Sequence, residues 1–149
     1  PNIHQNLRDG LPLPYTVSDA RAYIQGVLDA PADSKYSFAI VKDGRAIGSL
    51  GIFRKENIHR YTAELGYYIA EPYWGCGIAS CAVKEACQYV FSTTDLMRIF
   101  AEPYAHNTAS CRVLEKAGFT LEGILRRNAV KNGQVIDMKL YARLRSLAL

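Results

Sequence analysis

The residues best suited to chemistry lie between Ala63 and Ser80, a stretch that reads AELGYYIAEPYWGCGIAS. Its first half is typical of a β-strand, its second half is a glycine-rich loop, and an amphipathic pattern begins directly after the loop. A strand, a glycine loop and a helix N-terminus in this order can bind an anion. Backbone N–H groups point outward there, and the helix dipole favours negative charge. The sequence therefore predicts that residues 74–80 bind a phosphate group.

Glu64 is the first candidate for acid–base chemistry. Two-residue periodicity places it on the face of the predicted strand 60–70 that points away from the apolar side chains, and that strand leads directly to the glycine loop. A carboxylate at this place could act as a general base. The simpler alternative is a surface or salt-bridged carboxylate. Glu102 and His106, near the end of the next strand, are lesser candidates.

The glycine loop matches the sequence motifs of two common nucleotide-binding loops poorly. It has neither the lysine nor the spacing of the nucleoside triphosphatase loop. It approaches the dinucleotide fingerprint, with Ser80 in place of the third glycine and Asp95 farther along. That aspartate precedes the next predicted strand, whereas a ribose-binding acid lies at the far end of its strand. A nicotinamide-dinucleotide-binding protein therefore remains a remote alternative, and a purely structural turn is another.

Composition and cysteine spacing argue against several functional classes. The 149 residues carry a formal charge of +4, with basic residues scattered, so we expect no nucleic-acid partner but a mild attraction for an anionic cofactor. The sequence has no bilayer-spanning apolar run and no signal-peptide pattern, which favours a cytoplasmic protein without a membrane partner. Four cysteines without C-x-x-C spacing are expected to be reduced thiols, not a metal site.

Turn signals and periodicity predict the elements that position these residues. Residues 1–15 are expected to be irregular, Asp43-Gly44 and Asn132-Gly133 are hairpin turns, and the strand–helix–strand run around the glycine loop implies a parallel pair. The predicted helices run from a cap at Thr16 or Ser18 to about Ala30, from Ile78 to Phe91, and from a cap at Asn107 to Ala117. The predicted strands are 36–42, 45–54, 60–70, 96–101, 119–129 and 134–143. We therefore expect an α/β sheet of mixed direction with helices on both faces.

Three segments resemble the GNAT superfamily of N-acetyltransferases, and within it the RimJ/RimL-like subgroup related to ribosomal-protein N-acetyltransferases. They are PLPYTVSDARAYI at 12–24, AELGYYIAEPYWGCGIAS at 63–80 and NTASCRVLEKAGFTLEG at 107–123. In the second segment Gly77 and Ala79 fill the last two positions of the family's cofactor motif. Trp74 stands where arginine or glutamine is usual, a departure that is familiar in this subgroup.

The resemblance covers about residues 6–144 and implies one GNAT domain over residues 1–149. Its sheet would be mixed and mostly antiparallel, with about six to seven strands and a splayed central parallel pair, a fold that some schemes class as α+β. Family members usually begin with one more strand and helix. We therefore expect those elements to be missing here, which would leave the strand 36–42 with an exposed edge.

The resemblance also implies acetyl-CoA as the cofactor. N–H groups of residues 75–80 would hold its pyrophosphate, and its pantetheine arm would pair with the strand edge at 68–70. A backbone N–H at the splayed end of the strand would stabilise the thioester oxygen. The implied cofactor-binding residues are Tyr68, Ile69, Ala70, Trp74, Gly75, Cys76, Gly77, Ile78, Ala79, Ser80 and Asn107.

The implied reaction is direct transfer of acetyl to a primary amine, with Glu64 as the base and Ser110 as the general acid at the departing sulfur. A serine in a first helical turn could instead support the helix N-terminus, and Tyr104 and Tyr141 are the fallback donors. Asp137, on the last strand, is placed on the substrate side, where it would orient the substrate or only a neighbouring loop.

The acceptor amine stays open at the level of sequence, because a fold does not fix a substrate. A protein N-terminus, an amino acid, a polyamine and an aminoglycoside-type drug are all compatible with the resemblance, and the protein is expected to be a monomer or a homodimer. The main alternative is a non-catalytic acyl-CoA-binding sensor, which shares the glycine loop but gives Glu64 and Ser110 no role.

Overall fold

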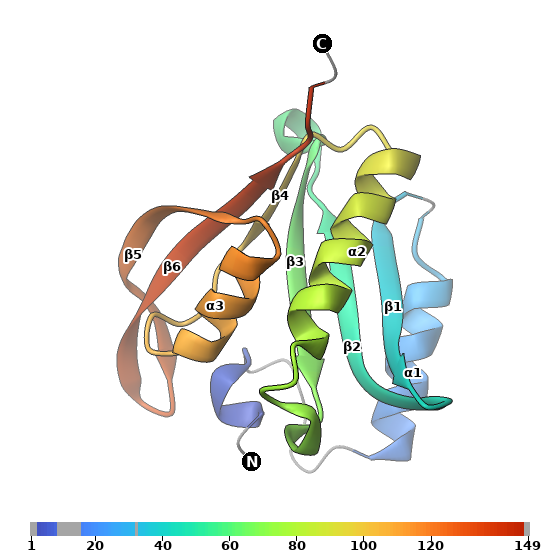
Figure 1. Cartoon of the computed structure of the whole chain (residues 1–149), viewed down its shortest axis with the longest axis horizontal. Coiled ribbons are helices and arrows are strands. Elements are labelled where there is room, and N and C mark those ends of the chain that lie inside the picture. The colour runs from blue at the N-terminus through green and yellow to red at the C-terminus, as the bar shows by residue number, and fades with distance from the viewer. Residues whose placement is uncertain (1–2, 9–15, 32, 148–149) are drawn as a thin grey trace.

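The computed structural model describes residues 3–8, 16–31 and 33–147, and its centre is a sheet of six strands (Figure 1). The strands are β1 Lys35–Lys42, β2 Arg45–Arg54, β3 Thr62–Ile69, β4 Arg98–Ala101, β5 Thr120–Lys131 and β6 Gln134–Leu144. Their order across the sheet is β1-β2-β3-β4-β6-β5, and every neighbouring pair is antiparallel except β3–β4. The expected mixed α/β sheet is confirmed.

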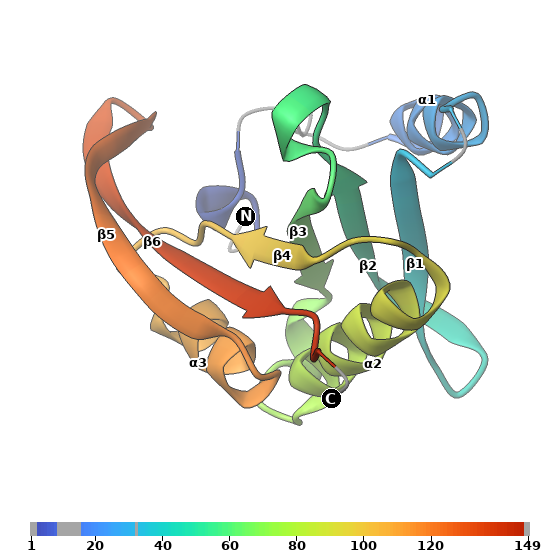
Figure 2. The same ribbon diagram turned by 90° about the horizontal axis from the view of Figure 1, so that it is seen from above.

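Helices lie on both faces of this sheet, as predicted. They are α1 Val17–Leu28, α2 Ile78–Thr93 and α3 Thr108–Lys116, together with the short 3-10 helices η1 His4–Asn6, η2 Asn57–His59 and η3 Glu71–Tyr73. Figures 1 and 2 show α2 and α3 on one face, and α1 and η1 on the other. We call the face covered by α2 and α3 the helical side of the sheet, and the face covered by α1 and η1 its N-terminal side.

Two tight turns fix the register of the outer hairpins. Asp43 and Gly44 have φ angles of 51° and 75°, and Asn132 and Gly133 repeat these values. Two successive residues with positive φ match the twist of the strands they join, which is why Asp-Gly and Asn-Gly are favoured there. Both predicted hairpins are therefore confirmed, and β1 forms one edge of the sheet.

The core lies between the sheet and the α2–α3 layer. Val83, Cys87 and Val90 of α2 are fully buried, as the helical spacing predicts. Ile52 of β2 and Ile99 of β4 are also fully buried. This packing fixes where α2 begins, and so it fixes the position of the glycine loop.

Some predicted boundaries move in the structure. β3 begins at Thr62 because residues 57–59 form η2, and β4 begins only at Arg98. Of the segment 1–15 that was expected to be irregular, residues 3–8 contain the single turn η1, while residues 1–2 and 9–15 lie outside the described part. α1 starts after a Thr16–Asp19 capping box, but most of its large apolar side chains are exposed, namely Val17, Tyr23, Ile24 and Leu28.

β3 and β4 pair over a very short distance. Only Thr62, Ala63 and Glu64 lie opposite β4, in register with Arg98, Ile99 and Phe100. Beyond these pairs the two strands part, and β4 continues its pairing with β6 instead. We term the stretch of β3 from Leu65 to Ile69, where it no longer faces β4, the β3–β4 fork.

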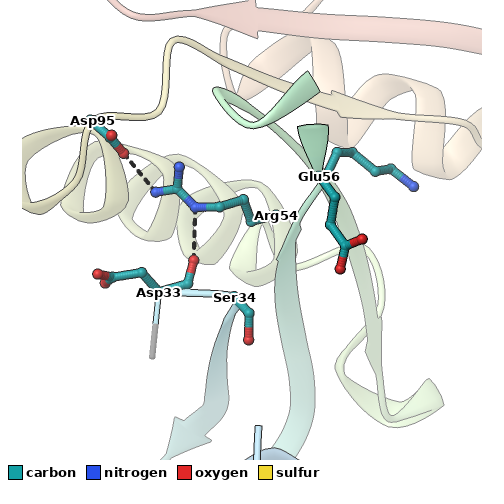
Figure 3. A pocket seen from close by; sticks show the side chains of 6 residues that line it. Asp33, Ser34, Arg54, Glu56 and Asp95 are labelled. Carbon is teal, nitrogen blue, oxygen red and sulfur yellow. Dashed lines mark hydrogen bonds and ion pairs between the residues drawn. The ribbon is translucent and has the colours of Figure 1, made fainter. Parts of the chain in front are cut away.

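A hollow of about 320 Å³ lies near the end of β2, away from the fork (Figure 3). Its centre is Arg54, which bonds the carboxylate of Asp95 and the backbone carbonyls of Asp33 and Arg60 at 2.6–2.7 Å. These contacts tie the start of β1 and the connection between α2 and β4 to the end of β2. Because the arginine is engaged by groups of the fold itself, we assign this hollow a structural role.

The buried position of Ile99 predicts a large loss of stability on truncation. Ile99→Ala should lower the free energy of unfolding by about 2–5 kcal/mol, because it leaves a cavity at the centre of the core. Ile58, in η2, is 81% exposed, so Ile58→Ala is the matched control and should change it by less than about 0.5 kcal/mol. Urea denaturation followed by circular dichroism measures both. Equal losses in the two variants would contradict this description of the core.

Candidate active site

The glycine loop joins the end of the fork to the start of α2. Gly75 and Gly77 both have φ near 74°, a backbone conformation that strongly favours glycine, and Gly77 is the N-cap of α2. Within the described residues no side chain caps this helix, and its first turn holds no acidic residue. Residues 74–77 are exposed. The helix N-terminus therefore presents its N–H groups to solvent in the arrangement that suits a phosphate.

Trp74 braces this loop against the sheet. Its indole N–H donates to the carbonyl oxygen of Ile69 at 2.8 Å, which ties the loop to the last residue of β3. The indole N–H is the only hydrogen-bonding group of this side chain, and the structure uses it for this contact with the sheet. The side chain thus holds the loop against the end of β3.

The sheet register shows which backbone groups of β3 point into the fork. The N–H of Ala70 donates to the carbonyl of Ile47 at 2.7 Å, so it points toward β2. In an antiparallel pair, backbone groups alternate between the two edges of a strand. The N–H groups of Tyr67 and Ile69 therefore point away from β2, toward the fork. Of the predicted pantetheine-binding segment 68–70, only Ile69 has its backbone on the fork side.

Glu64 lies at the last β3–β4 pair and is held by Arg8. The guanidinium donates to both carboxylate oxygens, from Nη1 at 3.2 Å and from Nη2 at 2.7 Å, and Nζ of Lys55 lies 3.8 Å from Oε1. The side chain of Glu64 is 15% exposed. The hydrogen bond to Glu64 raises the pKa of Arg8. Glu64 is thus a salt-bridged carboxylate, as the simpler alternative expected, and its role as a base stays a prediction.

Sequence reasoning missed Arg8, which precedes Glu64 by 56 positions and comes from the segment expected to be irregular. Its place is fixed by Tyr104, whose hydroxyl donates to the carbonyl of Leu7 at 2.9 Å. Nη2 of Arg8 also lies 3.6 Å from the carboxylate of Glu102. No periodicity or motif signals such a contact, because it depends on where the N-terminal segment crosses the sheet.

A second hollow, of about 320 Å³, lies beside this ion pair. Its lining comes from the N-terminal segment, the chain that follows β4, and the β5–β6 hairpin. The lining residues are Arg8, Glu102, Tyr104, Asn128, Ala129, Val130 and Met138. It therefore brings a carboxylate and apolar walls together on the Glu64 side of the sheet.

Ser110 occupies the helical side of the sheet, in the first turn of α3. Its N–H donates to the side chain of Asn107 at 3.2 Å, so Asn107 is the cap, as predicted. The hydroxyl of Ser110 is used elsewhere, because it lies 2.7 Å from the hydroxyl of Tyr67. Burial raises the pKa of Tyr67 to about 12. Sequence reasoning gave Tyr67 no chemical role.

The remaining predicted polar residues have contacts within the fold. Tyr104 and Tyr141 are buried, and their hydroxyls bond Leu7 and Glu115. The carboxylate of Asp137 accepts the N–H of Arg127 at 2.7 Å, at the irregularity of β5 where Arg127 has a φ of 54°. This contact holds the irregular part of β5, and the substrate-side role of Asp137 stays a prediction.

The position of Asp95 argues against the dinucleotide alternative. Its carboxylate is bonded to Arg54 at the C-terminal end of α2. A helix of that length separates it from the glycine loop by about 24 Å. A ribose-binding acid would have to lie near the glycine loop.

Two other site classes find no support in the described part of the chain. Cys87 and Cys111 are buried, Cys76 and Cys81 are exposed, and no three His, Cys, Asp or Glu side chains gather there as a metal site would need. Among the same residues, no helix combines the length and apolar character that a membrane span requires.

Comparison with known proteins identifies the family. A family model described as the acetyltransferase (GNAT) domain matches residues 2–120. The chain is 37% identical over 131 residues to the probable N-acetyltransferase YjcK of Bacillus subtilis (strain 168), covering 86% of this chain and 72% of that protein. It is 32% identical over 127 residues to the ribosomal-protein-serine acetyltransferase of Escherichia coli (strain K12), covering 85% and 70%.

A solved structure shares the fold. RimL, the ribosomal L7/L12 alpha-N-protein acetyltransferase in complex with coenzyme A, superposes with a TM-score of 0.83 and 27% identity, covering 94% of this chain and 78% of that one. The family model, the relatives in sequence and this shared fold agree, and the chain belongs to the GNAT family of acetyltransferases.

Proposed function

We propose that this protein transfers an acetyl group from acetyl-CoA directly to a primary amine. The observation that carries the proposal is the position of the uncapped N-terminus of α2 directly after the β3–β4 fork. An extended cofactor with a pyrophosphate at one end can span these two features. The coenzyme A complex of RimL supports this choice of cofactor.

Backbone groups would make most of the cofactor contacts. The N–H groups of residues 75–80, on both sides of Gly77, would bind the pyrophosphate. Beyond Glu64, β3 has no strand partner on its fork side. The peptide-like pantetheine arm would take that place and pair with Tyr67 and Ile69, whose N–H groups point into the fork. A backbone N–H of the fork would then stabilise the thioester oxygen as it gains negative charge.

The fork also separates the two chemical tasks. Glu64 and Tyr67 lie on opposite faces of β3, one beside the N-terminal segment and the other beside α3. A thioester in the fork can therefore receive the amine from the Glu64 side and release its sulfur toward Ser110. Glu64 takes the proton of the amine, nitrogen bonds to the carbonyl carbon, and the electron pair of the broken C–S bond stays on sulfur.

Arg8 is compatible with this role of Glu64. A carboxylate offers about four lone-pair positions, and the paired guanidinium uses one on each oxygen. An acceptor amine can use another, approaching from the hollow beside Glu102. The hollow holds both Arg8 and Glu102, so its charge does not choose among a protein N-terminus, an amino acid, a polyamine and an aminoglycoside.

Removing the proposed base should stop turnover without preventing cofactor binding. Glu64→Gln is expected to lower kcat by at least about 100-fold, the lower end of general base catalysis, while the Kd for acetyl-CoA stays nearly unchanged. The assay follows release of free thiol from acetyl-CoA with peptide N-termini, amino acids, spermidine and an aminoglycoside as acceptors. Glu85 on the exposed side of α2 supplies the matched control, Glu85→Gln, which should keep full activity.

Two outcomes of this assay would count against the proposal. A fully active Glu64→Gln variant would remove Glu64 from the reaction. Acetyl-CoA binding without thiol release for any amine in the panel would favour the non-catalytic sensor.

The glycine loop gives a separate prediction about affinity. Gly77→Ala introduces a side chain at a φ of 74°, which costs about 1–2 kcal/mol, so relaxation of the loop should raise the Kd for coenzyme A by about tenfold. Gly26, in α1, has no atom within 4 Å of an added Cβ, and Gly26→Ala is the control with unchanged Kd. Calorimetric titration of both variants measures the difference. An unchanged Kd for Gly77→Ala would mean that the loop does not bind the cofactor.

A further inference from the structure

We propose that Tyr67 is a positioning residue that orients the hydroxyl of Ser110 toward the departing sulfur, so that coenzyme A leaves as a thiolate held by a chain of two hydroxyls. The inference rests on the proposed function, since it concerns the sulfur of that cofactor. It adds Tyr67 to the site and changes the task of Ser110 from donating a proton to donating a hydrogen bond.

The contact between the two side chains is specific. The hydroxyl of Tyr67, on the fork, lies 2.7 Å from the hydroxyl of Ser110 and 3.5 Å from the carbonyl oxygen of the same residue. The N–H of Ser110 is already bonded to Asn107. The serine hydroxyl therefore does not cap its own helix and is held from the β3 side. Its alternative role as a support for the helix N-terminus is not what the structure describes.

The direction of this hydrogen bond follows from proton counting. Each hydroxyl has a single proton to donate. If Ser110 donates to sulfur, it must accept from Tyr67, and Tyr67 must then be protonated. Burial keeps Tyr67 in its neutral form across the physiological range, because its pKa rises to about 12. The order of donation is therefore from Tyr67 to Ser110 and from Ser110 to sulfur.

Magnitudes decide between proton transfer and hydrogen bonding. A thiol has a pKa of about 8.5, well below that of Tyr67, so transfer of the tyrosine proton through Ser110 to the thiolate is unfavourable. Hydrogen bonds to a charged acceptor are stronger than those between neutral groups. The pair therefore stabilises the thiolate as the C–S bond breaks. The protons of the amine go to Glu64 and solvent, and solvent protonates the thiolate after release.

Direct titration of the bound thiol tests this inference without knowledge of the acceptor. Ultraviolet absorbance of the thiolate is followed against pH for coenzyme A bound to the wild-type protein, Tyr67→Phe, Ser110→Ala and the double variant. A desulfo-coenzyme A complex is subtracted to remove the signals of cysteines and tyrosines. Tyr89, on the exposed side of α2, provides the control Tyr89→Phe.

The expected result is a bound thiol whose pKa in the wild-type complex lies below about 8.5. Tyr67→Phe and Ser110→Ala should each raise it by about one unit, the double variant should equal Ser110→Ala, and Tyr89→Phe should leave it unchanged. The kcat for acetyl transfer should fall in the two single variants with little change in the KM for acetyl-CoA.

Three results would overturn the inference. Tyr67→Phe could leave the bound thiol pKa unchanged while Ser110→Ala raises it, which would remove Tyr67 from the site. Tyr67→Phe could raise it while Ser110→Ala does not, which would place Tyr67 itself at the sulfur. Absence of coenzyme A binding to the wild-type protein would instead reject the proposed function, and the inference with it.

Discussion

The parting of β3 from β4 is the constraint on which the site depends. The two strands pair at three positions only, after which the backbone groups of β3 on that side lose their strand partner. Buried backbone groups need partners, and here Trp74 supplies one by donating to Ile69. The groups of Tyr67 remain directed toward the fork, where a peptide-like arm can pair with them. The N-terminus of α2, which we propose as the anchor for that arm, follows after a connection that contains η3 and the glycine loop.

The same constraint distributes charge and hydroxyl groups between two faces. Side chains on a strand alternate, so two positions three residues apart on β3 supply Glu64 to one face and Tyr67 to the other. Arg8 and Lys55 place positive charge around Glu64, whereas the pair of Tyr67 and Ser110 is uncharged and more buried. The carboxylate and the pair of hydroxyls therefore lie on opposite faces of the same strand.

Most of the fold could be predicted from local signals. The glycine turns, the buried stripe of α2 and the Asn107 cap depend on neighbours in sequence, and they appear where the pattern places them. The contacts of the site could not be predicted in this way. Arg8 meets Glu64 and Tyr67 meets Ser110 only because strand order and helix placement join segments 56 and 43 residues apart.

The most direct test of the account is calorimetric titration of the protein with acetyl-CoA, with NADPH as the control ligand. The account predicts binding of acetyl-CoA at micromolar concentration and no heat of binding with NADPH. Both ligands carry a pyrophosphate, but only acetyl-CoA has a peptide-like arm that can pair with β3 in the fork. Binding of NADPH, or no binding of acetyl-CoA, would contradict the assignment of the fork and the loop as a coenzyme A site.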